Sequence, residues 1–190
     1  MTIKFFIAST VVASFVAVTA FAHGKATGIV KERMDGMSIM GKAMKTLTPM
    51  MRGEVAFDGA VVREMGERIG AHAGTAMTKR FPAGSGGKPS EAKDAVWENW
   101  EEFSALAEQL HGYSEGLALA SYNGLMVPGS APADTGAMMG TGSAMMGGSA
   151  PMMDGTLGLE ALSEMPADGV FALVSQTCSA CHTKFRAEAK

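Results

Sequence analysis

Cysteine is almost absent from this chain, which has two cysteines among its 190 residues. So low a number excludes a network of structural disulfides, which many exported domains use for rigidity. The formal net charge of −3 offers no basic surface to a nucleic acid. No nucleophile and base occur in a pattern that indicates a hydrolase or transferase. We therefore expect a protein that is not an enzyme, does not bind nucleic acid, and owes its rigidity to packing.

The first 22 residues have the features of a secretory signal peptide. Lys4 provides the positive start, Phe5 to Val18 is almost wholly apolar, and Ala20-Phe21-Ala22 is an A-x-A cleavage site. Beyond this segment no apolar run approaches the ~20 residues of a membrane-spanning helix. The sequence predicts a signal peptide at 1–22, a mature domain at 23–190, and export to the periplasm without stable membrane insertion. Retention of the segment as an anchor is the alternative.

Both cysteines belong to one motif, Cys178-Ser179-Ala180-Cys181-His182. C-x-x-C-H is the attachment signature of a c-type haem, in which the thiols form thioethers and the imidazole binds iron. On a helix, residues three and four positions apart share a face, so one turn can present Cys178, Cys181 and His182 together. The alternatives are a C-x-x-C redox pair and half of a zinc site. The motif predicts one covalently bound haem c per chain.

Apolar residues recur at helical spacing in four segments, and no segment shows convincing strand alternation. The expected helices run from Ala26 to Arg52, from Asp58 to before the loop Phe81 to Pro89, from Ser90 to Asn123, and from Pro166 or Asp168 onward. Pro49 is expected to kink or end the first helix early. The pattern predicts an all-α antiparallel four-helix bundle, an architecture that holds cofactors between facing helices.

A segment of about 126–155 departs from this helical pattern. It consists of Gly, Ala, Ser, Pro and Met, and its methionine pairs fall at 138/139, 145/146 and 152/153. Glycine interrupts every repeat, so we interpret the segment as a flexible low-complexity insertion. The alternative is a tract for Cu(I), which thioether sulfur favours.

Motifs spread over most of the mature chain resemble those of class II c-type cytochromes, the group of cytochrome c prime and its low-spin relatives. The matching segments are Val30 to Arg33, Met37, Gly41 to Lys45, Arg52 to Glu54, Phe57-Asp58, Phe81 to Ser85, Val96-Trp97, Phe171 to Val174, the C-x-x-C-H motif and Phe185-Arg186. The insertion has no counterpart in the family pattern. The resemblance implies a four-helix bundle with covalent haem.

The resemblance also implies roles for individual residues. His182 is the proximal iron ligand, and Met37 faces the iron from the other side. The run from Met37 through Gly41 to Gly53-Glu54 most resembles the low-spin members, so we expect Met37 to be the sixth iron ligand of a periplasmic electron carrier that has a periplasmic redox partner protein. The alternative is that Met37 only covers the open face and that the protein binds a small gas such as nitric oxide or carbon monoxide. Arg33 resembles the family's arginine near the haem propionates, with a solvated helix-face charge as the alternative. A homodimer stays open.

Four further side chains draw notice but carry weaker expectations. His72 and His111 are isolated on predicted helices, and we expect both to be exposed to solvent. Trp97 and Trp100 are expected to pack in the core and at the haem edge rather than to relay electrons.

Overall fold

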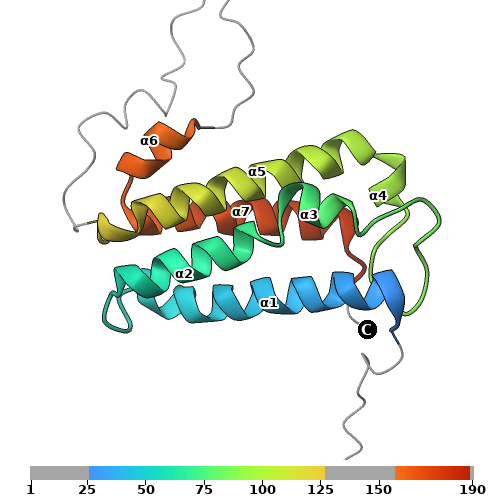
Figure 1. Cartoon of the computed structure of the whole chain (residues 1–190), viewed down its shortest axis with the longest axis horizontal. Helices are drawn as coiled ribbons and strands as arrows, with labels where there is room; N and C mark the ends of the chain where they lie inside the picture. The colour runs from blue at the N-terminus through green and yellow to red at the C-terminus, as the bar shows by residue number, and fades with distance from the viewer. Residues whose placement is uncertain (1–25, 127–156, 189–190) are drawn as a thin grey trace, which may run out of the picture.

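The computed structural model describes residues 26–126 and 157–188, and these form helices joined by loops (Figure 1). The helices are α1 (Gly28–Met51), α2 (Gly59–Gly70), α3 (Gly74–Thr78), α4 (Ala95–Glu98), α5 (Trp100–Leu119), the 3-10 turn η1 (Ala120–Tyr122), α6 (Leu159–Glu164) and α7 (Ala167–Phe185). Within the described ranges, β-type backbone pairing is limited to one isolated antiparallel bridge between Ala92 and Arg186. The predicted all-α class is confirmed.

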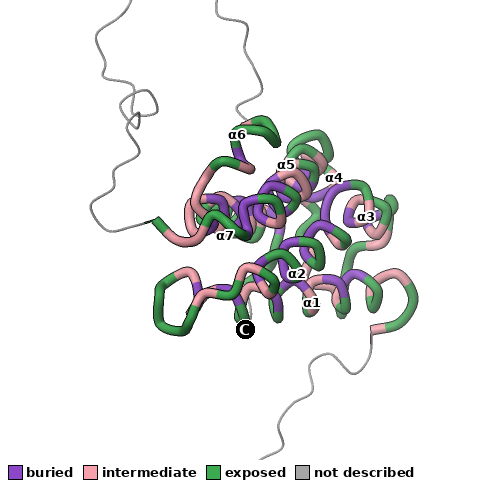
Figure 2. The backbone as a smooth tube through the Cα atoms, turned by 60° about the vertical axis from the view of Figure 1, so that its left-hand side comes forward, coloured by how far each residue is buried: buried purple, intermediate pink, exposed green. Residues whose placement is uncertain are grey.

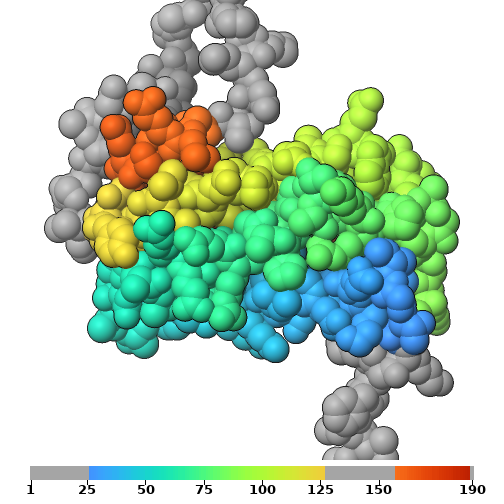
Figure 3. Space-filling view, viewed as in Figure 1, coloured from blue at the N-terminus to red at the C-terminus, as the bar shows by residue number. Residues whose placement is uncertain are grey.

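Four long elements make an antiparallel bundle: α1, the pair α2 and α3, α5, and α7. Successive elements run in opposite directions, and the buried faces point inward (Figures 1 and 2). Helix α5 packs against both α2 and α7, whereas α1 meets α7 at few points. The most deeply buried apolar side chains come from all four elements: Leu47, Val62, Ile69, Phe103, Leu117, Val170 and Val174. The face turned to the viewer in Figure 3 is formed by α1, α2, α3 and α5, with α6 above α5.

Local signals place several helix ends where the sequence predicts them. The Asp58 carboxylate accepts hydrogen bonds from the backbone nitrogens of Ala60 at 2.9 Å and Val61 at 3.2 Å, which caps α2. Gly124 adopts a φ of 74° just past the third bundle element, where a glycine C-cap is favoured. Pro49 lies inside the last turn of α1, which ends at Met51. Pro166 is the N-cap of α7, as expected.

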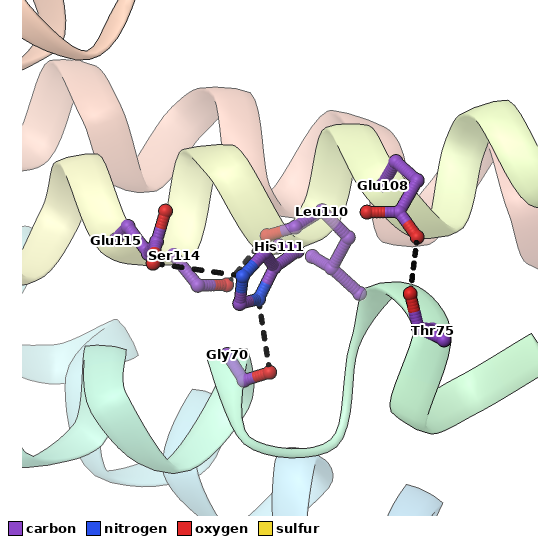
Figure 4. Close-up of polar contacts among 7 residues, drawn as sticks. All are labelled: Gly70, Thr75, Glu108, Leu110, His111, Ser114 and Glu115. Carbon is purple, nitrogen blue, oxygen red and sulfur yellow. Dashed lines mark hydrogen bonds and ion pairs between the residues drawn. The ribbon is translucent and has the colours of Figure 1, made fainter.

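The second predicted helix is broken, because α2 ends at Gly70 and α3 begins at Gly74 with a φ of 54°. His111 on α5 bonds the carbonyl of Gly70 through Nδ1 at 3.1 Å (Figure 4). The same carbonyl accepts a hydrogen bond from the Ala73 backbone nitrogen at 3.1 Å. The Thr75 hydroxyl donates to the Glu108 carboxylate at 3.2 Å, which holds the start of α3 against α5. Side chains of α5 thus supply contacts at the break that helical periodicity does not reveal.

The start predicted for the third helix at Ser90 is wrong. The hydroxyl of Ser90 accepts hydrogen bonds from the Ala92 nitrogen and from the Arg33 side chain, and helix begins only at Ala95. The chain then bends at Asn99, with a φ of −124° and a ψ of 51°, before α5. Helix α6 is a further element that the sequence analysis did not predict.

Among the described residues, no helix has both the length and the apolar character needed to cross a bilayer. The predicted signal peptide, and all but the first residue of the predicted insertion, lie outside the described residues.

Candidate functional site

A cavity of about 670 Å³ lies between α1 and α7, with walls also from α5 and the segment that joins α3 to α4. It exists because α1 and α7 contact one another at few points. Its volume falls in the range of roughly 300–1,000 Å³ of cofactor pockets. Phe81, Phe103 and Phe185 make part of its wall, and Phe103 lies between the other two rings at 4.7 and 5.5 Å. The cavity can therefore take a large, mainly apolar group.

The three residues of the haem motif stand on α7 beside this cavity. Cys181 and His182 line it, and Cys178 packs against the core one turn earlier. The two cysteines form no disulfide with one another, and both are half-buried. In the described ranges, these three residues included, no three His, Cys, Asp or Glu side chains cluster as a metal site. This arrangement fits covalent attachment of a haem better than a zinc site, which needs further ligands.

Burial controls the protonation of these groups. It raises the pKa of Cys178, and it raises the pKa of Cys181 to about 11, with a further contribution from the neighbouring Cys178. Burial also lowers the pKa of His182, and the positive charge of Arg186 adds to the effect while Glu91 opposes it. Before attachment the thiols are therefore protonated near neutral pH, and the imidazole is neutral, the form in which a ring nitrogen can bind iron.

The opposite wall of the cavity supplies two thioethers. Helix α1 contains six methionines, of which Met34 and Met37 line the cavity and are half-buried. Met37 and His182 thus stand on the walls of one cavity, on different helices. Of the six methionines on α1, therefore, two can reach a group in this cavity, Met34 and Met37.

Gly41, one turn after Met37, leaves space on the same wall. A Cβ added to Gly41 would meet no atom within 4 Å, although the residue lines the cavity. Glycine inside a helix costs roughly 0.5–1 kcal/mol relative to alanine. No side chain of the protein occupies the space beside Gly41, and this space has room for a planar group lying along α1.

Arg33 is buried, with 5% of its surface exposed, so the alternative of a solvated helix-face charge is wrong. Its guanidinium donates to the Arg80 carbonyl at 2.9 and 3.1 Å, to Ser85 Oγ at 2.8 Å and to Ser90 Oγ at 2.8 Å. Burial lowers the pKa of Arg33. Arg33 lines the cavity while it ties α1 to the segment 80–90, a structural role that the sequence did not indicate.

Trp97 and Trp100 were expected to pack, and His72 and His111 to be exposed to solvent; the structure places the four side chains differently from one another. Trp97 packs near Phe81 and its Nε1 donates to the Phe81 carbonyl at 3.0 Å, as expected for packing. Trp100 is 39% exposed. His111 is half-exposed and bonded to the α2 break, and His72 has a buried Nδ1 without a hydrogen-bond partner in the described chain. The two histidines are partly exposed rather than exposed as expected.

Fold and site together define a bundle that is built to hold a c-type haem. Residues 28–151 match the family model of cytochrome c′, which is more than half of the chain. The chain belongs to the cytochrome c′ family. The match ends before the C-x-x-C-H motif at 178–182, so that motif is independent support.

Two cytochromes c-556 from agrobacteria are similar in sequence. The protein of Agrobacterium tumefaciens is 37% identical over 97 residues, which cover 51% of this chain and 77% of the relative. That of Agrobacterium fabrum is 36% identical over 85 residues, covering 45% of this chain and 57% of the relative. The chain therefore spans little more than half of the second relative.

Solved cytochromes c′ share the fold. The protein of Thermochromatium tepidum has a TM-score of 0.56 at 21% identity, covering 84% of this chain and 95% of that chain. A carbon-monoxide-bound variant from Alcaligenes xylosoxidans has a TM-score of 0.55 at 16% identity, covering 84% and 94%. The predicted class II c-type cytochrome and four-helix bundle are confirmed. As in its family, the chain carries one covalently attached haem c and is an electron carrier or gas binder, not an enzyme.

Proposed function

We propose that this chain is a periplasmic electron carrier whose haem iron is bound by His182 on one side and by Met37 on the other. The observation that supports it is the position of both side chains on the wall of one cavity, on different helices. The predicted signal peptide and the cytochrome c′ family support the periplasm. Its redox partner is a periplasmic protein.

The chain's own residues have separate tasks in this proposal. When bound, the haem supplies an iron that gains and loses one electron. Cys178 and Cys181 fix the group to α7, and His182 presents a neutral ring nitrogen. Met37 offers a thioether, a ligand that raises the reduction potential. The aromatic side chains around Phe103 give the haem an apolar wall on one side of the cavity.

Gas binding is the second candidate, in which Met37 only covers an open iron face. Among the similar structures are a carbon-monoxide-bound variant and a nitric-oxide-bound mutant of cytochrome c prime from Alcaligenes xylosoxidans. One further similar structure is described as a cytochrome c′ with ligand-controlled dimer dissociation, and a homodimer of this chain remains a proposal to be tested by sedimentation.

Absorption spectra of the purified protein in both oxidation states test the choice. We expect a low-spin wild type that binds carbon monoxide poorly when reduced. Met37→Ala should then give a high-spin haem, a lower potential and rapid carbon monoxide binding. Met34→Ala is the matched control, because Met34 lines the same cavity from the same helix, and it should leave the spectrum unchanged.

Three outcomes would contradict the proposal. A high-spin wild type at neutral pH would support gas binding. Conversion to high spin by Met34→Ala instead of Met37→Ala would move the ligand to Met34. A low-spin spectrum that survives both substitutions would exclude the thioethers of this wall as ligands.

A further inference from the structure

Residues 90–93 lie between the two walls of the cavity, and we call them the bridging segment. Ser90, Glu91 and Ala92 line the cavity. The walls themselves, α1 and α7, contact one another at few points, and the other route between them runs through α2 and α5. A segment that is bonded to both walls therefore connects them directly at the site.

The bond to α1 is made by Ser90. Its hydroxyl accepts a hydrogen bond from Arg33 Nη1 at 2.8 Å, and it also accepts one from the Ala92 nitrogen at 3.1 Å. Arg33 is buried and lies one helical turn before Met37 on α1. This bond thus ties the bridging segment to the part of α1 that carries the proposed sixth ligand.

The bonds to α7 are made by the backbone of the bridging segment. The Lys93 nitrogen donates to the Phe185 carbonyl at 2.9 Å, and the Ala187 nitrogen donates to the Glu91 carbonyl at 2.7 Å. Phe185 and Ala187 closely follow His182 along the chain. The same short segment is therefore bonded near Met37 on one side and near His182 on the other.

The two attachments of the segment are unequal. The α7 side has the two backbone bonds and also the ion pair of Arg186 with Glu91 at 2.8 Å. Both side chains of that pair are partly exposed to solvent, so the pair itself contributes little. Among the described residues, the bond from Arg33 to Ser90 is the hydrogen bond that joins α1 to the segment. The Ser90 hydroxyl is therefore the point at which the connection can be cut.

We propose that the bridging segment sets the spacing between the two walls, and that Ser90 is a positioning residue that keeps Met37 within reach of the iron bound by His182. The inference rests on the proposed electron-carrier function. Side chains that bind one metal from separate elements must be held within about 0.5 Å of the working geometry. Replacing residues that orient metal ligands typically costs about 10–100-fold in metal affinity. Loss of the Ser90 hydroxyl should therefore leave Met37 in place on α1 but let it leave the iron more often.

The rate of carbon monoxide binding to the reduced holoprotein tests the proposal, because the gas binds only when Met37 leaves the iron. Ser90→Ala should raise this rate, measured by stopped flow, by about tenfold, the lower end of the effect of such orienting residues. The oxidised variant should stay mainly low-spin, since the thioether is still present. Ser90→Thr keeps the hydroxyl and should bind carbon monoxide as slowly as the wild type.

Ser85→Ala is the matched control. Ser85 Oγ accepts a hydrogen bond from Arg33 Nη2 at 2.8 Å, the same length as the bond to Ser90, but Ser85 does not line the cavity. This substitution removes an acceptor of the same guanidinium without cutting the connection to α7, and it should keep the wild-type rate. An unchanged rate in Ser90→Ala, or equal acceleration in both variants, would overturn the proposal.

Amide hydrogen exchange of the holoprotein gives a readout that does not depend on gas binding. In Ser90→Ala, the Lys93 and Ala187 amides should stay as protected as in the wild type, because the segment remains bonded to α7. Faster exchange at both amides would overturn the proposal, since the segment would then have unfolded instead of separating from α1. A changed reduction potential with an unchanged carbon monoxide rate would also overturn it, because Ser90 would then act on the haem and not on the position of Met37.

The wild-type spectrum separates failure of the function from failure of this inference. A high-spin wild type would defeat the electron-carrier function and the positioning role together. A low-spin wild type whose Ser90→Ala variant binds carbon monoxide no faster would overturn the positioning role alone.

Discussion

The guanidinium carbon of Arg33 lies 4.0 Å from the centre of the Phe81 ring. A cation over an aromatic face is attracted by the ring quadrupole, and desolvation strengthens the contact. The stacking adds to the hydrogen bonds that Arg33 donates to Arg80, Ser85 and Ser90. Together they fix one wall of the haem cavity to α1.

The first prediction concerns this contact. Arg33→Lys should lower the free energy of unfolding by about 2–3 kcal/mol, because an ammonium cannot serve these acceptors in fork geometry and leaves buried oxygens unpaired. Urea denaturation measures the loss, and limited proteolysis should show earlier cutting within residues 80–90. Arg63→Lys on α2, an exposed site, is the control and should change stability little. Equal stability of the two variants would show that Arg33 does not hold this wall.

The second prediction concerns covalent attachment. Replacement of both Cys178 and Cys181 by Ala should make the haem extractable into acidified organic solvent, because no thioether can form. Cys178→Ala alone should retain one thioether and resist extraction. Haem that stays with the protein after the double substitution would refute the attachment sites.

Gly41 carries the third prediction, which tests the space left on α1. Gly41→Leu should reduce haem incorporation, because its side chain enters the cavity, while the stability of the haem-free chain rises by about 0.5–1 kcal/mol through helix propensity. Gly112→Leu is the control on α5, where an added Cβ also meets no atom within 4 Å and the residue does not line the cavity. It should stabilise the chain and leave haem content unchanged. Normal haem content in Gly41→Leu would show that the haem does not lie along this part of α1.

A pair of histidines gives the fourth prediction. His72 Nδ1 is buried without a partner in the described residues, whereas His111 Nδ1 bonds Gly70. An unpaired buried polar group costs about 1–3 kcal/mol, so His72→Leu should raise the melting temperature. His111→Leu should lower it by exposing the α2 break. A lower melting temperature in His72→Leu would mean that a water satisfies the ring.

Sequence reasoning succeeded where the cause is local and failed where it is distant. Asp58 caps α2 through nitrogens two and three residues away, and the period of α7 follows from its own apolar positions. Arg33 instead bonds residues 47 and 57 positions further on. His111, which bonds the Gly70 carbonyl at the α2 break, lies 41 positions further along the chain. Neither contact leaves a mark in local periodicity, so the burial of Arg33 could not be predicted. The split helix does have a local signal, the glycines Gly70 and Gly74, which the apolar period does not register.

The Asn123 side chain donates to the carbonyls of Ser163 at 2.6 Å and Met165 at 2.8 Å. The Met126 nitrogen bonds the Asp168 carboxylate at 2.9 Å. The folded ends on both sides of residues 127–156 are therefore pinned to each other by contacts of their own. Closing a connecting loop costs only about 0.6 kcal/mol more for each doubling of its length. Because these contacts hold the two sides together without the chain between them, α7 with its haem should stay docked on the rest of the bundle after a single proteolytic cut between residues 127 and 156.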